Sequence, residues 1–325
     1  MKKIILTKAF EGLDHEARFQ CYRKLWQQTA QHEVITDFPL HLDIELSAIC
    51  NLKCRRCFQN GLLDGPLGLM TVELFHKIID EGAVLGLCAI KLQVRGESLL
   101  HPQFFDCITY AKQSGILDVQ VTTNATLLNK NNVESLFHSG LDGLIVSYDR
   151  HHGDAVTGYD YNNVEQNIRC VLDHRVKLAT KRPWVRIQAS IEEGNRDKIA
   201  EELKTLFPEA NSIDVNKIHI FDYDLECYAG LTENNDLLPC NYPMQRMAIY
   251  WNSDVTACCM DYNNLFKFGN VNSQTISEIW NSDKVAGFRN MHSDGRRSEI
   301  KVCNRCLVAI KPKIKRGDAD GSNCR

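Results

Sequence analysis

The sequence predicts an α/β fold, namely a partial (β/α)6 barrel of the TIM type followed by a small cysteine-rich α+β domain. Between residues 41 and 220, strand-like runs alternate with segments of helical length, which predicts parallel strands joined by right-handed crossovers. After Phe221 this alternation stops, and Asn, Asp, aromatic and Cys residues gather instead. We therefore predict an N-terminal flank over residues 1–39, a barrel over 40–222 and a C-terminal domain over 223–325.

The elements follow in order along the chain. The flank is charged, with a helical pattern over Asp14–Gln31. Six runs rich in apolar residues predict strands at Leu42–Ser47, Ile90–Val94, Val119–Thr123, Leu144–Tyr148, Val185–Ile191 and Val215–Ile220. Apolar residues at helical spacing predict the helices between them at Thr71–Leu85, Gln103–Ser114, Asn129–His138, Val164–Leu172 and Arg196–Phe207. Six units are too few to close a barrel, so we expect it to be open on one side.

Composition limits the function further. The formal net charge of −3 over 325 residues argues against a nucleic-acid-binding surface. The apolar start of the chain is cut short by Lys8 and Glu11, so it does not predict a signal peptide, and no run has the length of a membrane span. Fourteen cysteines in a chain expected in the cytoplasm indicate metal binding or catalysis and not disulfides.

Three of these cysteines, Cys50, Cys54 and Cys57, follow the first predicted strand directly. The carboxyl ends of barrel strands are where catalytic groups gather. Three thiolates in one short loop suit an iron–sulfur cube that keeps one iron open, since a cube normally takes four cysteines. A zinc site and three unrelated buried thiols are the alternatives, but zinc usually gathers four ligands from two knuckles and no second pair lies nearby.

This CxxxCxxC spacing, followed by Phe58, resembles the signature of the radical S-adenosylmethionine (SAM) enzymes. The resemblance implies a [4Fe-4S] cluster whose open iron binds the amino and carboxylate groups of SAM, with Phe58 shielding the cluster. It also implies the partial barrel that the strand pattern predicts.

Two further segments carry the resemblance. Residues Arg95–Pro102 are similar to the family's Gly-Gly-Glu-Pro loop, which implies that Glu97 receives the SAM amino group; Arg95 and Ser98 depart from that pattern. Residues Thr122–Thr126 match the family's strand-four segment, with Ala125 where glycine is usual, and imply that Asn124 faces SAM or the substrate.

The resemblance also implies that Ser147 contacts the SAM ribose and that Gln188 is a weaker candidate of the same kind. The segment Tyr148–Asp154 contains His151 and His152, but adjacent histidines point to different sides of the backbone. We therefore expect a polar loop that faces the substrate and not a metal site there.

The C-terminal domain brings a second group of cysteines. Short strands at Ile249–Trp251 and Val255–Ala257, with a turn at Asn252–Asp254, predict a hairpin that brings Cys240 and the Cys258 region to one end. The knuckle Cys303-x-x-Cys306 then completes a four-thiolate site, which on chemistry alone suits zinc or an iron–sulfur cluster.

The order of these cysteines, with Gly269-Asn270-Val271 and Ile279-Trp280 between them, resembles a SPASM domain. The resemblance implies one auxiliary [4Fe-4S] cluster held by Cys240, Cys258, Cys303 and Cys306, because only Cys324 remains near the end for another. The distance from the turn favours Cys258 over Cys259 as the ligand.

Cys259 is then left over beside the cluster. It is either a buried thiol without a catalytic role or, as in related enzymes that epimerise sugars or peptides, a donor of a hydrogen atom to a substrate radical. The remaining cysteines are expected to be structural; they are Cys21, Cys88, Cys107, Cys170 and Cys227.

The resemblance implies reductive cleavage of SAM to a 5′-deoxyadenosyl radical that takes hydrogen from a substrate C–H bond. We predict epimerisation of a carbohydrate or aminocyclitol, because 39 residues are too few for the leader-recognition domain of many peptide-modifying relatives. A flavodoxin- or ferredoxin-type protein would supply electrons. Alternatives are oxidation of an alcohol to a ketone, a peptide-modifying maturase, and a non-enzymatic iron–sulfur or zinc scaffold.

Overall fold

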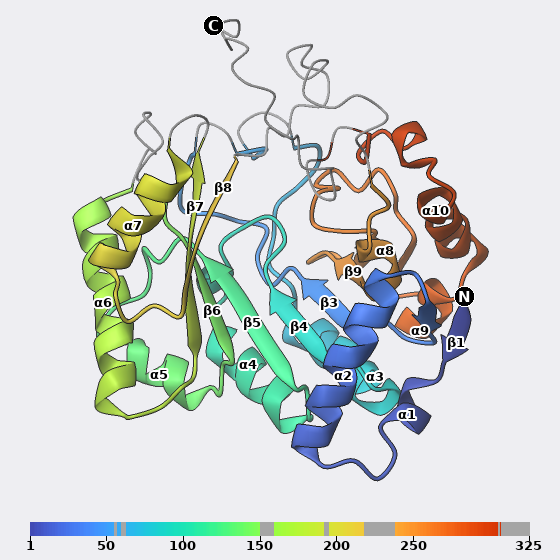
Figure 1. Ribbon diagram of the computed structural model, residues 1–325, viewed down its shortest axis with the longest axis horizontal. Coiled ribbons are helices and arrows are strands. Elements are labelled where there is room, and N and C mark those ends of the chain that lie inside the picture. The colour runs from blue at the N-terminus through green and yellow to red at the C-terminus, as the bar shows by residue number, and fades with distance from the viewer. Residues whose placement is uncertain are drawn as a thin grey trace, which may run out of the picture.

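The computed structural model describes residues 1–54, 57–59, 63–149, 159–191, 195–217, 238–304 and 306. Its main feature is a nine-stranded sheet in the order β11-β10-β9-β3-β4-β5-β6-β7-β8 (Figure 1). From β3 to β8 the strands lie side by side in chain order and every neighbouring pair is parallel. The predicted six-unit α/β architecture is confirmed.

The six predicted strands all form, with ends that differ by a few residues. They are β3 (His41–Ile44), β4 (Ala89–Leu92), β5 (Asp118–Thr123), β6 (Gly143–Ser147), β7 (Trp184–Ile191) and β8 (Ser212–Lys217). The predicted end of the last strand, residues 218–220, and the His151-His152 loop lie outside the described residues.

The five predicted helices form between these strands. They are α3 (Val72–Leu85), α4 (Phe104–Gln113), α5 (Val133–His138), α6 (Tyr161–Lys177) and α7 (Arg196–Leu206). Side-chain caps define three of the starts, because Thr71, Asp160 and Asn195 accept hydrogen bonds from backbone N–H groups of the first turn.

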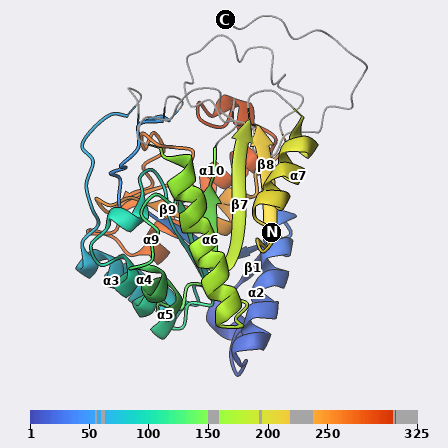
Figure 2. The same cartoon turned by 90° about the vertical axis from the view of Figure 1, so that its left-hand side faces the viewer.

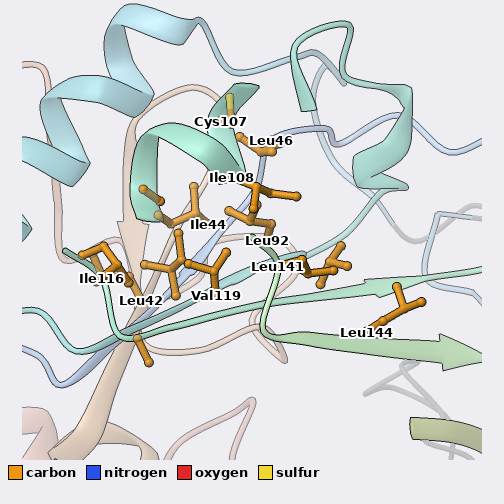
Figure 3. Close-up of a cluster of buried hydrophobic side chains, with 14 of the residues drawn as sticks. Leu42, Ile44, Leu46, Leu92, Cys107, Ile108, Ile116, Val119, Leu141 and Leu144 are labelled. Carbon is orange, nitrogen blue, oxygen red and sulfur yellow. The ribbon is translucent and has the colours of Figure 1, made fainter. Parts of the chain in front are cut away.

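The two faces of the sheet differ in polarity. One face is apolar and packs against the helices; Figure 3 shows Leu42, Ile44 and Val119 of this face gathered with Ile108 of α4. The opposite face, which we call the inner face, carries the polar residues of the alternating strands. It includes Asp43, Lys91, Gln120, Ser147, Arg186 and Gln188. The interior of the barrel is therefore lined by polar side chains.

The N-terminal flank packs at the amino-terminal edge of the sheet. It comprises β1 (Lys2–Ile4), α1 (Leu6–Ala9), α2 (His15–Ala30) and β2 (Val34–Thr36). In Figure 2, α2 lies on one side of the sheet and α3, α4 and α5 on the other. The Trp26 ring of α2 lies 5.9 Å from that of His41, and the Gln245 amide donates to the Trp26 carbonyl at 2.7 Å. Helix α2 therefore closes the amino-terminal end of the barrel.

The C-terminal part continues the same sheet, which the sequence does not predict. It comprises α8 (Tyr242–Gln245), β9 (Arg246–Ile249), β10 (Asp254–Thr256), β11 (Gly269–Asn270), α9 (Ile276–Trp280), α10 (Asp283–Ser293) and the 3₁₀ turn η4 (Arg297–Glu299). Another 3₁₀ turn, η1 (Ser98–Leu100), follows β4 in the barrel. Strand β9 pairs in parallel with β3, from His41 opposite Arg246 to Ile44 opposite Ile249.

The predicted hairpin exists but is shifted toward the N-terminus. Its first strand ends at Ile249, which pairs with Ile44 of β3 on one side and with Val255 of β10 on the other. The chain then turns over residues 250–253. The predicted boundary at residues 222 and 223 lies outside the described residues. Across the described chain, no helix is both long and apolar enough to cross a membrane.

Candidate active site and its two thiol groups

Cys50, Cys54 and Cys57, which we call the first thiol group, lie on the loop after β3 at the carboxyl edge of the parallel strands. The Cys57 N–H donates to the Cys54 carbonyl at 3.0 Å, which turns the loop back on itself. Burial raises the pKa of all three thiols, that of Cys54 to about 12, and the neighbouring thiols add to the shift of Cys54. Cluster binding must therefore displace three protons.

This cysteine loop is tied to the loop after β4. A Cβ atom at Gly96 would lie 2.3 Å from the Ser47 carbonyl oxygen, so only glycine fits there. The Glu97 N–H donates to the Ile49 carbonyl at 2.9 Å, and the Gln59 amide donates to the carbonyls of Ala48 and Arg95 at 2.8 and 3.1 Å. Sequence reasoning missed Gln59, although it stands two residues after the third cysteine.

Glu97 lies beside the first thiol group with its carboxylate buried. Its Oε1 accepts from the Thr123 hydroxyl at 2.9 Å and from the Leu99 N–H at 3.1 Å, and its Oε2 accepts from the Asn124 N–H at 2.8 Å. Burial raises the Glu97 pKa, and these hydrogen bonds oppose the shift. A carboxylate oxygen accepts two hydrogen bonds, so Oε2 retains room for a donor from a ligand.

Asn124 links β5 to the first thiol group. Its Nδ2 lies 3.9 Å from the Cys50 Sγ and donates to the Asn51 side chain at 3.0 Å. The next residue, Ala125, has φ = 60°, a left-handed conformation that explains why glycine would suit this position. Asn167 of α6 holds the turn by donating to the Ala125 carbonyl at 3.0 Å.

Ser147 and Gln188 are register partners on β6 and β7, so both face the barrel interior at its carboxyl edge. The Ser147 hydroxyl donates to the Asp149 carboxylate at 3.1 Å, and the Ser190 N–H donates to the same carboxylate at 2.8 Å. Asp149 also contributes to raising the pKa of Cys54, after burial and the two neighbouring thiols. Sequence reasoning missed Asp149, an acidic residue just past the end of a barrel strand.

Aromatic and charged residues join the first thiol group to the C-terminal part. Phe58 stacks on Tyr262 with ring centroids 5.0 Å apart and an interplanar angle of 9°. Arg95, which departs from the family pattern, forms two 2.7 Å hydrogen bonds to the buried Glu45 carboxylate and one of 3.1 Å to the Tyr262 carbonyl. Its guanidinium also lies 4.0 Å from the centroid of the Tyr250 ring.

Cys240, Cys258, Cys303 and Cys306 form the second thiol group. They come from a position two residues before α8, the end of the hairpin and the chain after η4, where the Cys306 N–H donates to the Cys303 carbonyl at 3.4 Å. Burial raises the pKa of Cys240, Cys258 and Cys303, that of Cys303 to about 12. Neighbouring thiols of the group add to each shift.

Cys259 has a different neighbourhood from Cys258. It packs against Val94, Ala248 and Tyr250, and Ala248 stands opposite Asp43 in the sheet. Burial raises the Cys259 pKa to about 11, and the Asp43 carboxylate adds to this shift while Lys91 and Arg246 oppose it. Cys259 therefore borders the inner face of the barrel, whereas Cys258 lies among the thiols.

The number and spacing of the cysteine sulfurs in each thiol group bear on whether the group suits one metal ion or a cluster. Around one zinc ion, sulfurs at about 2.3 Å would lie within about 4 Å of one another. Among the residues that the structure describes, no three His, Cys, Asp or Glu side chains are arranged to hold a single metal ion. A cube binds each thiolate through a different iron, so it accepts more widely spaced sulfurs. Three and four thiols fit one cube with an open iron and one fully ligated cube.

Comparison with family models agrees with this chemistry. Residues 44–182 match the model of the radical SAM superfamily, and residues 240–307 match the SPASM model of an iron-sulfur cluster-binding domain. The chain belongs to the radical SAM superfamily and carries a SPASM domain. Its cofactors are accordingly [4Fe-4S] clusters and SAM.

Individual relatives are distant. A Pyrococcus furiosus protein named "Tungsten-containing aldehyde ferredoxin oxidoreductase cofactor-modifying protein" is 24% identical over 301 residues, or 77% of this chain and 83% of that one. The crystal structure of BtrN in complex with AdoMet and 2-DOIA has 18% identity and a TM-score of 0.56, covering 84% of this chain and 96% of BtrN. Streptococcus suis SuiB bound to S-adenosylmethionine has 18% identity and a TM-score of 0.62, covering 85% and 73%. These structures share the fold.

A groove of about 760 Å³ lies elsewhere, between α6 and α7. Residues of both helices line it, including Arg169, Lys198 and Leu203. None of its lining residues belongs to either thiol group, so we do not place the active site there.

Proposed function

We propose that this radical SAM/SPASM enzyme epimerises a carbon centre of a carbohydrate or aminocyclitol. In this proposal the first thiol group holds the SAM-binding cluster and the second thiol group holds one auxiliary cluster. The position of Cys259, beside the auxiliary ligands yet bordering the inner face, is the observation that carries the proposal.

The bound cluster and SAM together supply a 5′-deoxyadenosyl radical, and the protein positions the reacting groups. Glu97 Oε2 accepts a hydrogen bond from the SAM amino group, a charge-assisted contact of about 1.5–3 kcal/mol. Asn124 orients the ligand from the end of β5, and Ser147 with Gln188 contacts the ribose from β6 and β7. The stacked rings of Phe58 and Tyr262 exclude water from the cluster.

Cys259 completes the reaction by giving its hydrogen atom to the substrate carbon from the face opposite the adenosyl group. The S–H bond breaks, a C–H bond forms, and a thiyl radical remains. One electron from a ferredoxin- or flavodoxin-type donor and one proton from solvent return the thiyl to a thiol. Because 5′-deoxyadenosine leaves with the original hydrogen, the product carries a solvent-derived one.

The inner face supports a polar substrate. Lys91, Gln120 and Arg186 place nitrogen donors on β4, β5 and β7, and Asp43 of β3 places a carboxylate on the same face. A hydroxyl-rich ring can exchange hydrogen bonds with such groups, whereas an apolar substrate would only remove water from them.

Replacement of Cys259 by Ala tests the proposal. The variant should retain both clusters and still form 5′-deoxyadenosine, but should lose inverted product. In heavy water the wild type should place one deuterium at the inverted carbon. Cys170→Ala, which removes a partly buried thiol of α6, is the matched control and should leave the product unchanged. Inverted product from Cys259→Ala would refute the assignment.

Oxidation of an alcohol to a ketone is the second candidate. Its support is the fold shared with BtrN, where the match covers 96% of the BtrN chain. The charge of Cys306 also acts on Cys259, which is consistent with an auxiliary cluster near the interior. A product two mass units lighter than the substrate, without solvent deuterium, would establish this outcome. Modification of a peptide, in line with the structure of SuiB bound to the precursor peptide SuiA, would instead appear as a mass change in a peptide.

A further inference from the structure

A buried arginine lies against the second thiol group. Arg297 opens the 3₁₀ turn η4 and is only 2% exposed. Its Nη2 donates to the Cys306 carbonyl at 2.8 Å and its Nη1 donates to the Leu238 carbonyl at 2.9 Å. One of these carbonyls belongs to a cysteine of the group and the other stands two residues before Cys240, so the guanidinium spans two of the three segments that carry the thiols.

The charge of this guanidinium reaches the thiols themselves. Burial raises the pKa of Cys240 and of Cys303, and Arg297 opposes the rise at both. A cation that favours thiolates also favours any other negative charge that develops at the same place.

A second polar group touches the same site from α10. His292 is 1% exposed, and its Nε2 lies 3.8 Å from the Cys303 Sγ. Its Nδ1 is buried and has no hydrogen-bond partner among the described residues. A buried ring nitrogen without a partner destabilises the protein less as an acceptor than as an N–H donor. We therefore assign the ring proton to Nε2, which donates it to the Cys303 sulfur, and leave Nδ1 as the acceptor.

We propose that Arg297, supported by the His292 hydrogen bond, raises the reduction potential of the auxiliary cluster above that of the SAM-binding cluster. Reduction adds one negative charge to a cluster, and a buried cation in a medium of low dielectric constant stabilises the reduced form. Hydrogen bonds to the cluster sulfurs act in the same direction. Arg297 is a positioning residue here, since it acts through the cluster and not on the substrate.

The surroundings of the first thiol group act in the opposite sense. The described groups whose charges act on its thiols include the carboxylates of Glu97 and Asp149, which disfavour added negative charge. The proposal holds for either fate of the substrate radical, but it rests on the proposed ligands of the auxiliary cluster.

Redox titration followed by electron paramagnetic resonance tests the proposal. Full-length protein with Cys50, Cys54 and Cys57 replaced by Ala isolates the signal of the auxiliary cluster. In this background Arg297→Met should lower the equilibrium constant for one-electron reduction at least tenfold, which corresponds to 59 mV. Arg297→Lys keeps the charge and should shift the potential by less than half as much.

Arg296→Met is the matched control, because Arg296 precedes Arg297 but is 53% exposed and paired with Glu299. It should leave the potential unchanged. An Arg297→Met protein with four irons and an unchanged potential would overturn the proposal. Should that variant lose its iron, His292→Leu decides instead: a lower potential supports the proposal and an unchanged one rejects it. Retention of all four irons after Cys306→Ser would show separately that the ligand assignment is wrong.

Discussion

The two thiol groups differ in ligand number and in the charge around them. The first has three cysteines on a single loop, beside the carboxylates of Glu97 and Asp149. The second has four cysteines from three segments, beside the guanidinium of Arg297. SAM brings a cationic sulfonium and an ammonium group, so an acidic site with an open iron is suited to bind it. A fully ligated cluster binds no such cation, and basic surroundings suit its negative charge.

The difference indicates that the first thiol group suits a cluster that binds SAM and the second suits a fully ligated cluster. In the first, the acidic residues come from the loops after β4 and β6, at the edge where a ligand enters. In the second, the basic residue is enclosed with the thiols, since Arg297 is only 2% exposed. We propose that ligand number and local charge together separate a cluster that binds SAM from one that exchanges electrons.

Loss of the first thiol group should have the largest effect. We predict that replacing Cys50, Cys54 and Cys57 together by Ala leaves about half of the approximately eight irons expected for two cubes. Formation of 5′-deoxyadenosine should fall below detection, because no open iron remains to bind SAM. Iron analysis and chromatography measure both quantities. Cys21→Ala is the control and should retain all of the iron, and SAM cleavage by the triple variant would contradict our assignment.

Loss of the second thiol group should separate the two roles. Cys306→Ser should also remove about half of the iron, but the protein should still cleave SAM, since the first thiol group is intact. Product formation should be lost in this variant. Equal loss of SAM cleavage in both cysteine variants would mean that the two groups do not act independently.

The junction between the two regions gives the next largest effect. Glu45→Gln leaves the Arg95 guanidinium without its buried carboxylate, which should lower the free energy of unfolding by about 3–5 kcal/mol. The exposed pair Arg296–Glu299 is the matched comparison, and Glu299→Gln should cost no more than about 1 kcal/mol. Denaturant unfolding of the metal-free protein measures both. Similar values for the two variants would show that the buried pair is not a structural link.

The smallest expected effect concerns the hydrogen bond from Thr123 to Glu97. Thr123→Val keeps the side-chain volume but removes the donor, so it should weaken SAM binding by about 1 kcal/mol, or roughly fivefold. Thr123→Ser keeps the hydroxyl and should bind SAM as the wild type does. Calorimetric titration with SAM measures the affinity, and equal affinities of the Val and Ser variants would remove Glu97 from the proposed SAM contact.

The sequence by itself determined the six-unit α/β architecture and the iron–sulfur chemistry. Alternating strands and helices leave a periodic pattern, and Cys50, Cys54 and Cys57 act through spacing within one loop, so both are local signals. The hairpin was also predictable, although its position was not, because Ile249 pairs with the distant Ile44 as well as with Val255.

Only the tertiary structure decided how the two regions meet. The parallel pairing of β3 with β9, the hydrogen bond from the Trp251 N–H to Glu45 and that from Arg95 to the Tyr262 carbonyl join chain segments that share no periodic pattern. The same holds for Cys259, whose neighbour Asp43 is more than 200 residues away in the chain. Such contacts form because a barrel brings its strand ends together in space, and nothing in the local sequence records which distant side chain will lie opposite.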